Sequence, residues 1–332
     1  MSTATTPATP RSIASQWDAP LHAALVEAVP GLTIVPVGPG PGFDGLAGLR
    51  DATGRPVEVL LARPFALAQR DAPPPAGWPW GLRWIQLISV GLDGYPAWLL
   101  ATPGVTVSNA HGSSADTIAD FVLAHVLRVQ ARLDARRVRS PEGWRLQPAA
   151  ALAGARLGLV GFGAIGRAVA QRALALGLQV RAVRRQGLPD LPGVDPAADV
   201  AALAAWADHL VLATPGGLAT RHLVDARVLR QARPGLHLIN IARGSLVDTD
   251  ALCEALDNGR VGEASLDVTE PEPLPVGHWL YRHPRVWLTP HTSAIGPQVQ
   301  RALVELTAEG LQAWHNGRPP AHRVDPPWPA AA

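Results

Sequence analysis

The chain has 332 residues, enough for roughly two domains, and its hydrophobic content of 47% suffices for two sizeable cores. Its 29 basic residues, all of them arginine, nearly balance 27 acidic residues, and a net charge of +2 gives no reason to expect nucleic-acid or membrane binding. Because lysine is absent, guanidinium groups or backbone N–H groups must meet any phosphate or carboxylate.

The start of the chain and its cysteine content indicate a cytoplasmic protein. Residues 1–15 begin with polar Thr/Pro/Ala sequence, which predicts a disordered tail and lacks the pattern of a signal peptide. Cys253 is the single cysteine, so an internal disulfide is excluded, as suits a reducing compartment. No apolar run is long enough to cross a bilayer.

Alternating helix and strand patterns predict a first α/β unit. Helical apolar spacing covers Leu21–Val29 and ends at a proline. The strand candidates are Leu32–Val37, Val57–Ala62, Ile85–Val90 and Val105–Asn109. A long helix is then expected over Ser113–Asp134, followed by a loop over Ser140–Ala151.

A strand, a glycine turn and a helix follow this loop. Leu157–Val160 has the length of a buried strand, and Gly161, Gly163 and Gly166 have the spacing G-x-G-x-x-G. In this context the first glycine permits a tight turn, the second lets N–H groups approach a pyrophosphate, and the third allows close helix–strand packing. The segment therefore predicts a dinucleotide site at a helix N-terminus.

Further strands and helices complete a second unit of the dinucleotide-binding kind. The strands are expected at Gln179–Val183, His209–Ala213, Leu236–Ile241, Gly262–Val268 and Arg285–Leu288, and the helices at Asp225–Ala232 and Thr249–Asn258. We predict two Rossmann-like, doubly wound parallel-sheet domains. The first is discontinuous and flavodoxin-like, comprising residues 16–112 and 293–328, because the final helix, Pro297–Trp314, is expected to pack back on it. The dinucleotide-binding domain comprises residues 113–292.

Three strands of the second unit end in segments that carry chemistry. Arg243 follows one strand, Glu270 and Glu272 follow the next, and His291 follows the last. Ligands bind at this carboxyl edge of an open parallel sheet. Arginine can hold a substrate carboxylate and polarise its carbonyl, and histidine backed by a carboxylate can donate a proton. Each residue alone is more often structural, so the hypothesis rests on their joint placement.

These segments resemble the D-isomer-specific 2-hydroxyacid dehydrogenase family, which has a glycine turn followed by N-x-x-R-G, D-V-x-x-x-E-P and P-H in this order. The resemblance implies catalytic roles for Arg243, for Glu272 rather than Glu270, and for His291. It also implies that Asp267 binds the nicotinamide. The substrate carboxylate would be bound by Arg243 and by a loop whose backbone N–H groups come from Val90 and Gly91.

The second strand of the dinucleotide unit ends in Arg184 and Arg185, where members of the family that prefer NAD tend to have Asp. A guanidinium group attracts the 2′-phosphate that a carboxylate would repel. We therefore expect NADP(H) to be preferred, with NAD(H) possible, and we expect no metal. The predicted cofactor-binding residues are Gly161, Gly163, Ala164, Ile165, Gly166, Arg184, Arg185, Thr214, Pro215, Ala242 and Asp267.

The resulting hypothesis is an NAD(P)H-dependent enzyme that reduces a small 2-oxo acid of the glyoxylate or hydroxypyruvate type to the D-2-hydroxy acid. The alternatives are oxidation of formate or phosphite, a bulkier 2-oxo acid, or a dinucleotide-sensing scaffold like the corepressors of the family. Retention of Arg243, Glu272 and His291 argues against a scaffold. The family implies a homodimer, and we expect Trp144 to pack under its own loop rather than to reach a neighbouring subunit's site.

Overall fold

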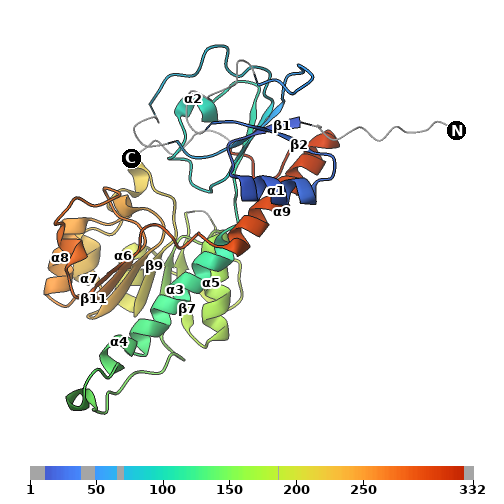
Figure 1. Ribbon diagram of the computed structural model, residues 1–332. Coiled ribbons are helices and arrows are strands. Elements are labelled where there is room, and N and C mark those ends of the chain that lie inside the picture. The colour runs from blue at the N-terminus through green and yellow to red at the C-terminus, as the bar shows by residue number, and fades with distance from the viewer. Residues whose placement is uncertain (1–11, 39–48, 66–70, 186, 325–332) are drawn as a thin grey trace. The chain divides into compact units, whose positions relative to one another are not determined.

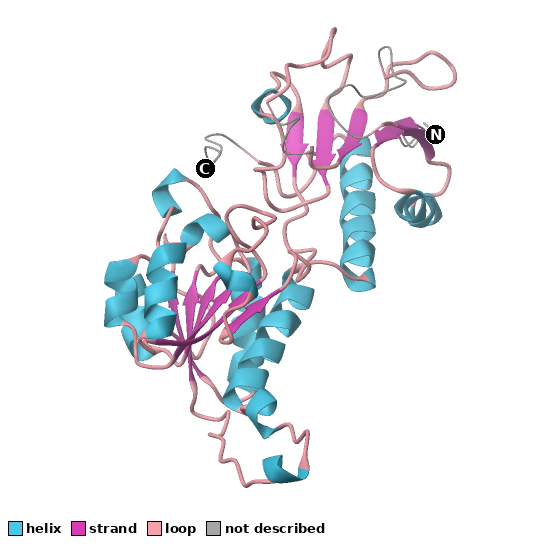
Figure 2. Cartoon of the chain, turned by 60° about the vertical axis from the view of Figure 1, so that its left-hand side comes forward, coloured by secondary structure: helices cyan, strands magenta, loops and turns pink. Residues whose placement is uncertain are grey.

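The computed structural model describes residues 12–38, 49–65, 71–185 and 187–324. The chain divides into two compact units, one running to Ser113 and resuming at Gly296, and the other comprising Ser114–Ile295. These divisions fall close to the predicted boundaries at residues 112 and 293. Each unit is an α/β structure built on a parallel sheet, which confirms the predicted fold class and the discontinuous first domain (Figure 2).

The five strands of the first unit's described residues form a parallel sheet in the order β2-β1-β3-β4-β5. This is the flavodoxin-like order of doubly wound sheets. The elements of this unit are β1 (Ser12–Ser15), α1 (Ala19–Ala28), β2 (Thr33–Pro36), β3 (Val59–Ala62), β4 (Trp84–Leu87), α2 (Ala97–Leu100), β5 (Thr106–Ser108) and α9 (Pro297–His315).

Strand β1 corrects the sequence prediction, because Ser12–Ser15 do not belong to a disordered tail. The strand pairs in parallel with β2 on one side and with β3 on the other. Ile13 and Ala14 are fully buried and enter the clusters on opposite faces of the sheet. A four-residue strand with two apolar residues is too short to show a period, so only its neighbours reveal it. Residues 1–11 of the predicted tail lie outside the described residues.

Helix α9 returns the end of the chain to the first unit. It packs beside α1, and Leu303 and Leu311 join Ile13 and Trp84 in one apolar cluster. The helix passes directly over the Trp84 ring, since a Cβ atom at Gly310 would lie 2.9 Å from it. The discontinuity therefore follows from burial of the apolar face of this helix.

The seven strands that the structure describes in the second unit form a parallel sheet in the order β12-β11-β10-β9-β6-β7-β8. The order reverses between β6 and β9, which defines the crevice where such sheets bind dinucleotides. The strands are β6 (Arg156–Val160), β7 (Gln179–Val183), β8 (Val194–Pro196), β9 (His209–Leu212), β10 (Leu236–Asn240), β11 (Val261–Leu266) and β12 (Val286–Leu288).

Helices cover both faces of this sheet (Figure 1). One face packs on α3 (Ala115–Gln130) and α5 (Ala164–Ala175), and the other on α6 (Val200–Trp206), α7 (Ala226–Gln231) and α8 (Thr249–Asp257). Successive residues of β6 face opposite sides of the sheet. Leu159 packs in the apolar cluster with α3 and α5, whereas Val160 packs in the cluster with α6, α7 and α8. Strands buried on both faces explain the continuous apolar runs of the sequence.

Two parts of the second unit differ from the sequence prediction. Strand β8 and helix α6 were not predicted, because Val194–Pro196 is short and contains a proline. The long helix expected over Ser113–Asp134 ends at Gln130, and the separate short helix α4 (Leu133–Arg136) follows. Arg132 between them has a φ of 51°, a left-handed conformation that interrupts a helix.

The segment after α4 contains the 3₁₀ turn η2 (Pro141–Gly143) and lies beyond the end of α3 (Figure 1). The Trp144 side chain is 82% exposed, so the expectation that it packs under its own loop is wrong. None of the helices formed by the described residues has the length and apolar content needed to span a membrane.

Candidate active site

The glycine turn is sterically fixed at its first and third glycines and open at its second. Gly161 has a φ of 100°, and a Cβ atom there would lie 2.5 Å from the carbonyl oxygen of Ala213. A Cβ atom at Gly166 would lie 2.4 Å from the carbonyl oxygen of Gly161. By contrast, no atom lies within 4 Å of a Cβ placed on Gly163. The turn therefore leaves room at the position where a pyrophosphate approaches the backbone.

The N-terminus of α5 suits an anionic group. Asp199, Asp225 and Asp248 cap the neighbouring helices α6, α7 and α8 through their carboxylates. Helix α5 instead begins after Gly163, a residue that has no side chain with which to cap it. The first-turn N–H groups of a helix and its dipole together attract a phosphate. Ala164 and Ile165 thus contribute their backbone N–H groups rather than their side chains, and the site fits the pyrophosphate of a dinucleotide.

Arg184 and Arg185 directly follow β7 and are both exposed. Arg184 Nη1 lies 3.6 Å from Asp190 Oδ1 and donates to the carbonyl oxygen of Leu188 at 3.5 Å. Arg167 in the first turns of α5 also donates to Asp190. One carboxylate is therefore shared by two guanidinium groups beside the glycine turn.

Backbone packing holds Arg243 in place after β10. A Cβ atom at Gly244 would lie 2.0 Å from the carbonyl carbon of Thr269, so only glycine allows the two backbones to pass. A Cβ atom at Gly216 would lie 2.8 Å from Arg243 Cγ. The Asn240 side-chain amide donates to the carbonyl oxygen of Arg243 at 2.8 Å. The stem of Arg243 is thus enclosed at the carboxyl edge of the sheet.

His291 and Glu272 form a hydrogen-bonded ion pair. His291 Nδ1 donates to Glu272 Oε2 at 3.0 Å, and Glu272 Oε1 accepts from the Thr269 N–H at 3.3 Å. The two side chains are 45% and 41% exposed. With Nδ1 engaged, Nε2 is the nitrogen that faces a reaction partner. Glu270 pairs instead with Arg221 at 2.8 Å, on the other side of the same turn.

Asp267 fixes the loop that carries His291. Its Oδ1 accepts from the Thr289 hydroxyl at 2.6 Å and from the Thr292 N–H at 2.9 Å, and its Oδ2 accepts from the Ser293 N–H at 3.0 Å. The backbone N–H of His291 donates to the Asp267 carbonyl at 2.8 Å. His291 has a φ of 54°, a strained conformation that these bonds maintain. Asp267 is only 1% exposed, and its role toward nicotinamide stays a prediction.

The electrostatics of the pair favour a charged imidazole. The hydrogen bond to Glu272 raises the pKa of His291 above its ordinary value, against burial and the positive charge of Arg243. Burial alone raises the pKa of Asp267, but its hydrogen bonds from Ser293, Thr289 and Thr292 lower that pKa overall. The His291 imidazole therefore stays protonated to a higher pH than a free imidazole, which suits it to donate a proton.

The structure brings most of the predicted residues to one sheet edge. The glycine turn follows β6, Thr214 and Pro215 follow β9, Ala242 and Arg243 follow β10, and Asp267 follows β11. Val90 and Gly91 belong to the other unit, after β4, where the Ser89 hydroxyl donates to the Gly91 carbonyl at 2.8 Å. The Val90 carbonyl accepts from Asn109 at 3.0 Å, so the loop is braced from two sides.

Sequence reasoning missed several residues that shape this site. Gly216 lies against the Arg243 side chain, and Gly244 lies against the Thr269 backbone. The hydroxyl of Thr289 holds Asp267, and Asp190 pairs with Arg184. A signal for Thr289 existed in the run Thr-Pro-His-Thr-Ser around His291, which is rich in hydroxyl groups. No local signal indicated Asp190, because it lies in a loop and its hydrogen-bond partner Arg167 is 23 residues away.

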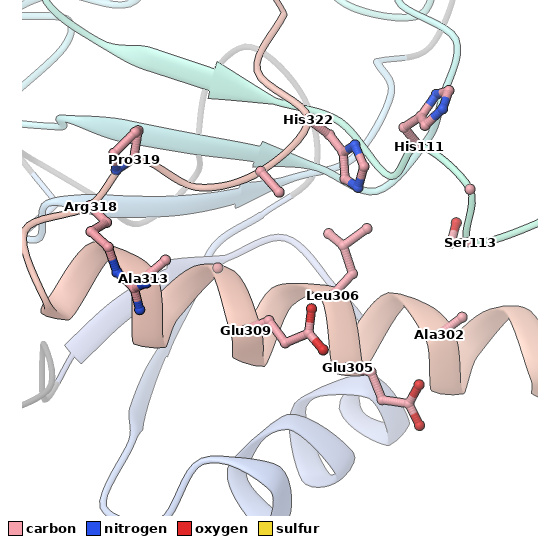
Figure 3. A pocket seen from close by; sticks show the side chains of 13 residues that line it. His111, Ser113, Ala302, Glu305, Leu306, Glu309, Ala313, Arg318, Pro319 and His322 are labelled. Atoms are coloured by element: carbon pink, nitrogen blue, oxygen red, sulfur yellow. The ribbon is translucent and has the colours of Figure 1, made fainter. Parts of the chain in front are cut away.

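A separate pocket of about 510 Å³ lies within the first unit, between α9 and the segments around His111 and His322 (Figure 3). Glu305 and Glu309 line its helical side. The imidazole rings of His111 and His322 lie 5.2 Å apart between centroids and are tilted by 40°, and burial together with the charge of His322 lowers the pKa of His111. Within the described ranges, no three His, Cys, Asp or Glu side chains are grouped as metal ligands. No predicted active-site residue lines this pocket.

Comparison with known proteins supports the interpretation of the sheet edge. Residues 122–293 match the family described as D-isomer specific 2-hydroxyacid dehydrogenase, NAD binding domain. The chain belongs to this family. The protein is therefore an NAD(P)-dependent 2-hydroxyacid dehydrogenase or 2-oxo acid reductase, and its cofactor is a nicotinamide dinucleotide.

Individual relatives extend over most of the chain. Glyoxylate reductase from Thermococcus litoralis is 33% identical over 257 residues, which cover 74% of this chain and 77% of that enzyme. A D-isomer specific 2-hydroxyacid dehydrogenase from Xanthobacter autotrophicus, solved with NADPH and MES, has 29% identity and a TM-score of 0.77, covering 96% and 98% of the two chains. NADPH-dependent glyoxylate/hydroxypyruvate reductase from Sinorhizobium meliloti, solved with NADP and malonate, has 27% identity, a TM-score of 0.72 and coverage of 96% and 97%.

Proposed function

We propose that this protein reduces a small 2-oxo acid of the glyoxylate or hydroxypyruvate type to the D-2-hydroxy acid, using NADPH in preference to NADH. The observation that carries the proposal is the His291–Glu272 pair, which lies at the same sheet edge as Arg243 and the glycine turn. The relatives from T. litoralis and S. meliloti are named for glyoxylate or hydroxypyruvate reduction.

Each residue at the edge has a task that its geometry suits. Arg243 holds the substrate carboxylate and polarises the carbonyl. The dinucleotide supplies the hydride when it is bound. His291 Nε2 donates a proton to the developing alkoxide oxygen, and Glu272 keeps the imidazole charged and oriented. After the transfer, the neutral imidazole takes up a proton from solvent.

The preference for NADPH is supported by the two arginines that end β7. Arg184 and Arg185 supply positive charge where a 2′-phosphate would meet the protein, and no carboxylate ends that strand. The related structures from X. autotrophicus and S. meliloti hold NADPH and NADP. Arg184→Asp is expected to reverse the preference toward NADH, and an unchanged ratio of kcat/KM values for the two cofactors would contradict this assignment.

A substrate panel tests the proposed activity. Oxidation of NADPH and of NADH is followed with glyoxylate, hydroxypyruvate and bulkier 2-oxo acids, and reduction of NADP and NAD with formate and phosphite. Turnover is expected with the small 2-oxo acids, and His291→Gln should lower kcat by about 100-fold or more while dinucleotide binding persists. Turnover of formate or phosphite alone would favour that alternative, and tight dinucleotide binding without turnover would favour a scaffold.

We also propose that the protein is a cytoplasmic homodimer, assembled through α3 and the segment after it. That segment exposes Leu133, Val138, Trp144 and Leu146, and the last two side chains are 82% and 103% exposed. Exposed apolar side chains in sequence proximity indicate an interaction surface. Sedimentation should show a dimer, and Trp144→Glu combined with Leu146→Glu should yield monomers. The control Val276→Glu, at an equally exposed loop residue, should leave the dimer intact.

A further inference from the structure

An ion triad connects the end of β7 to the start of α5. Asp190 Oδ1 accepts a hydrogen bond from Arg167 Nη2 and lies 3.6 Å from Arg184 Nη1. Arg167 directly follows Gly166, the last glycine of the turn, and Arg184 directly follows β7. The two guanidinium groups therefore converge on one anion beside the proposed dinucleotide site, and in this chain that anion is a carboxylate.

The triad is accessible to a ligand. The side chains of Arg167, Arg184 and Asp190 are 37%, 39% and 59% exposed. An exposed ion pair contributes little to stability, because water and salt screen it. Asp190 can consequently move aside at small cost when another anion competes for the same two arginines.

We propose that Asp190 is a specificity-determining residue, an internal counter-ion that occupies the position of a 2′-phosphate and moderates the preference for the phosphorylated dinucleotide. The inference rests on the proposed use of NADPH. The 2′-phosphate of NADPH must displace the carboxylate from Arg184 and Arg167, and it is repelled by that carboxylate if the displacement is incomplete. NADH has no phosphate at this position and leaves the triad intact.

A purely structural role for Asp190 leads to different behaviour. If the carboxylate only fastened residues 187–190 to α5, its removal would alter the binding of both dinucleotides equally. If it accepted a hydrogen bond from a ribose hydroxyl, its removal would weaken NADH. The internal counter-ion, in contrast, lowers affinity only for ligands that carry the 2′-phosphate.

Calorimetric titration of Asp190→Asn separates these cases. The ligands are NADPH, NADH and 2′,5′-ADP, which carries the 2′-phosphate without the nicotinamide. Relative to wild type, NADPH and 2′,5′-ADP should bind about three- to fivefold more tightly, the size expected of an exposed ion pair, and NADH should be unchanged. The gain should shrink at high ionic strength. Unchanged NADPH affinity, equal gains for both dinucleotides or weakened NADH binding would each overturn the proposal.

Three further variants sharpen the test. Asp190→Glu keeps the charge and should retain the wild-type affinities, whereas Asp195→Asn removes the charge of an exposed residue on β8 and should have no effect. In an Arg184→Ala background, the gain from Asp190→Asn should be smaller, because one partner of the triad is gone; an undiminished gain would overturn the proposal. These readouts are binding constants, so failure of 2-oxo acid reduction would appear separately, in the turnover of wild type.

Discussion

His291 is positioned by two neighbouring acidic residues. Its backbone is held at a φ of 54° by Asp267, and its Nδ1 is held by Glu272. Strained conformations persist only where the surroundings determine them, and this one is anchored by three hydrogen bonds to the Asp267 carboxylate. The acid is thus positioned by the ends of two strands, β11 and β12.

Glu272→Gln tests the electrostatic part of this arrangement. Glu272 raises the pKa of His291, so the charged imidazole needed for reduction is present below that pKa and is lost as the pH rises through it. Removing the carboxylate lowers the pKa. The fall of kcat/KM on the alkaline side should therefore move to lower pH, with a loss of about tenfold or more at pH 8.

The matched control is Glu270→Gln, which removes the carboxylate paired with Arg221 in the same turn. Its pH profile should overlay that of wild type. If Glu272→Gln left the alkaline limb of the profile where it is, Glu272 would have no electrostatic role in catalysis.

At this scale, the sequence indicated the residues that carry chemistry and missed those that position them. Arg243 and His291 end strands that are visible as apolar runs, and the resemblance selected Glu272 over Glu270. Gly216 and Gly244 were not singled out, since their close contacts with Arg243 and with Thr269 are made in the tertiary structure. A glycine in a loop gives no indication of which backbone will pass it.

The glycine turn shows at the level of an element why three similar residues have different tasks. The fold requires glycine at positions 161 and 166, because a Cβ atom at either would collide with backbone atoms. A Cβ atom at Gly163 would face open space, so we interpret this glycine as needed only for the close approach of the dinucleotide phosphates.

Alanine substitutions should distinguish the glycine that ligand binding requires from those that the fold requires. Gly163→Ala is expected to leave the melting temperature close to that of wild type, since φ is −90° and the added methyl group meets nothing. It should weaken NADPH binding by about tenfold, equivalent to ~1.4 kcal/mol, because the methyl group enters the phosphate's approach. Thermal melts and calorimetric titration of the same samples measure both effects.

Gly166→Ala should behave in the opposite way and lower the melting temperature before any ligand is added, because its Cβ would lie 2.4 Å from the Gly161 carbonyl oxygen. Wild-type NADPH affinity in Gly163→Ala would show that the phosphates do not approach the turn at its second glycine.

Helices and strands with a clear hydrophobic pattern were predicted correctly. Elements that depend on pairing with strands distant in the chain were not. Helix α9 and the buried strands β6 and β10 were located within one or two residues. Strands β1 and β8 and helix α6 were missed. Each of these strands has three or four residues and is stabilised by pairing with strands distant in the chain.

The second unit contains a buried histidine cluster whose protonation concerns the stability of the whole molecule. His209 Nδ1 and His237 Nδ1 lie 3.0 Å apart, and the chain of contacts continues from His237 to Ser265 at 2.9 Å and from His209 to Gln130 at 3.1 Å. His125 on α3 is also buried, and its Nδ1 has no partner among the described residues. The sequence predicted the strands that carry His209 and His237, but it gave no indication that their imidazoles meet.

Burial lowers the pKa of His125 and of His209 to about 4, and lowers that of His237 as well. A histidine kept neutral in the fold but free to ionise when unfolded weakens the fold as the pH falls below its ordinary pKa of about 6.5. The free energy of unfolding should therefore decrease between pH 7.5 and pH 5, by about 2 kcal/mol for each such histidine.

His209→Gln tests this origin, since glutamine keeps a polar contact but cannot be protonated. Urea unfolding at pH 7.5 and at pH 5, followed by circular dichroism, should show a smaller loss of stability on acidification than in wild type. The absolute stability of the variant at pH 7.5 does not enter the comparison. His315→Gln, on the last turn of α9, removes a histidine outside the cluster. This variant should lose as much free energy of unfolding between pH 7.5 and pH 5 as wild type does. Equal losses in all three proteins would place the acid sensitivity elsewhere in the molecule.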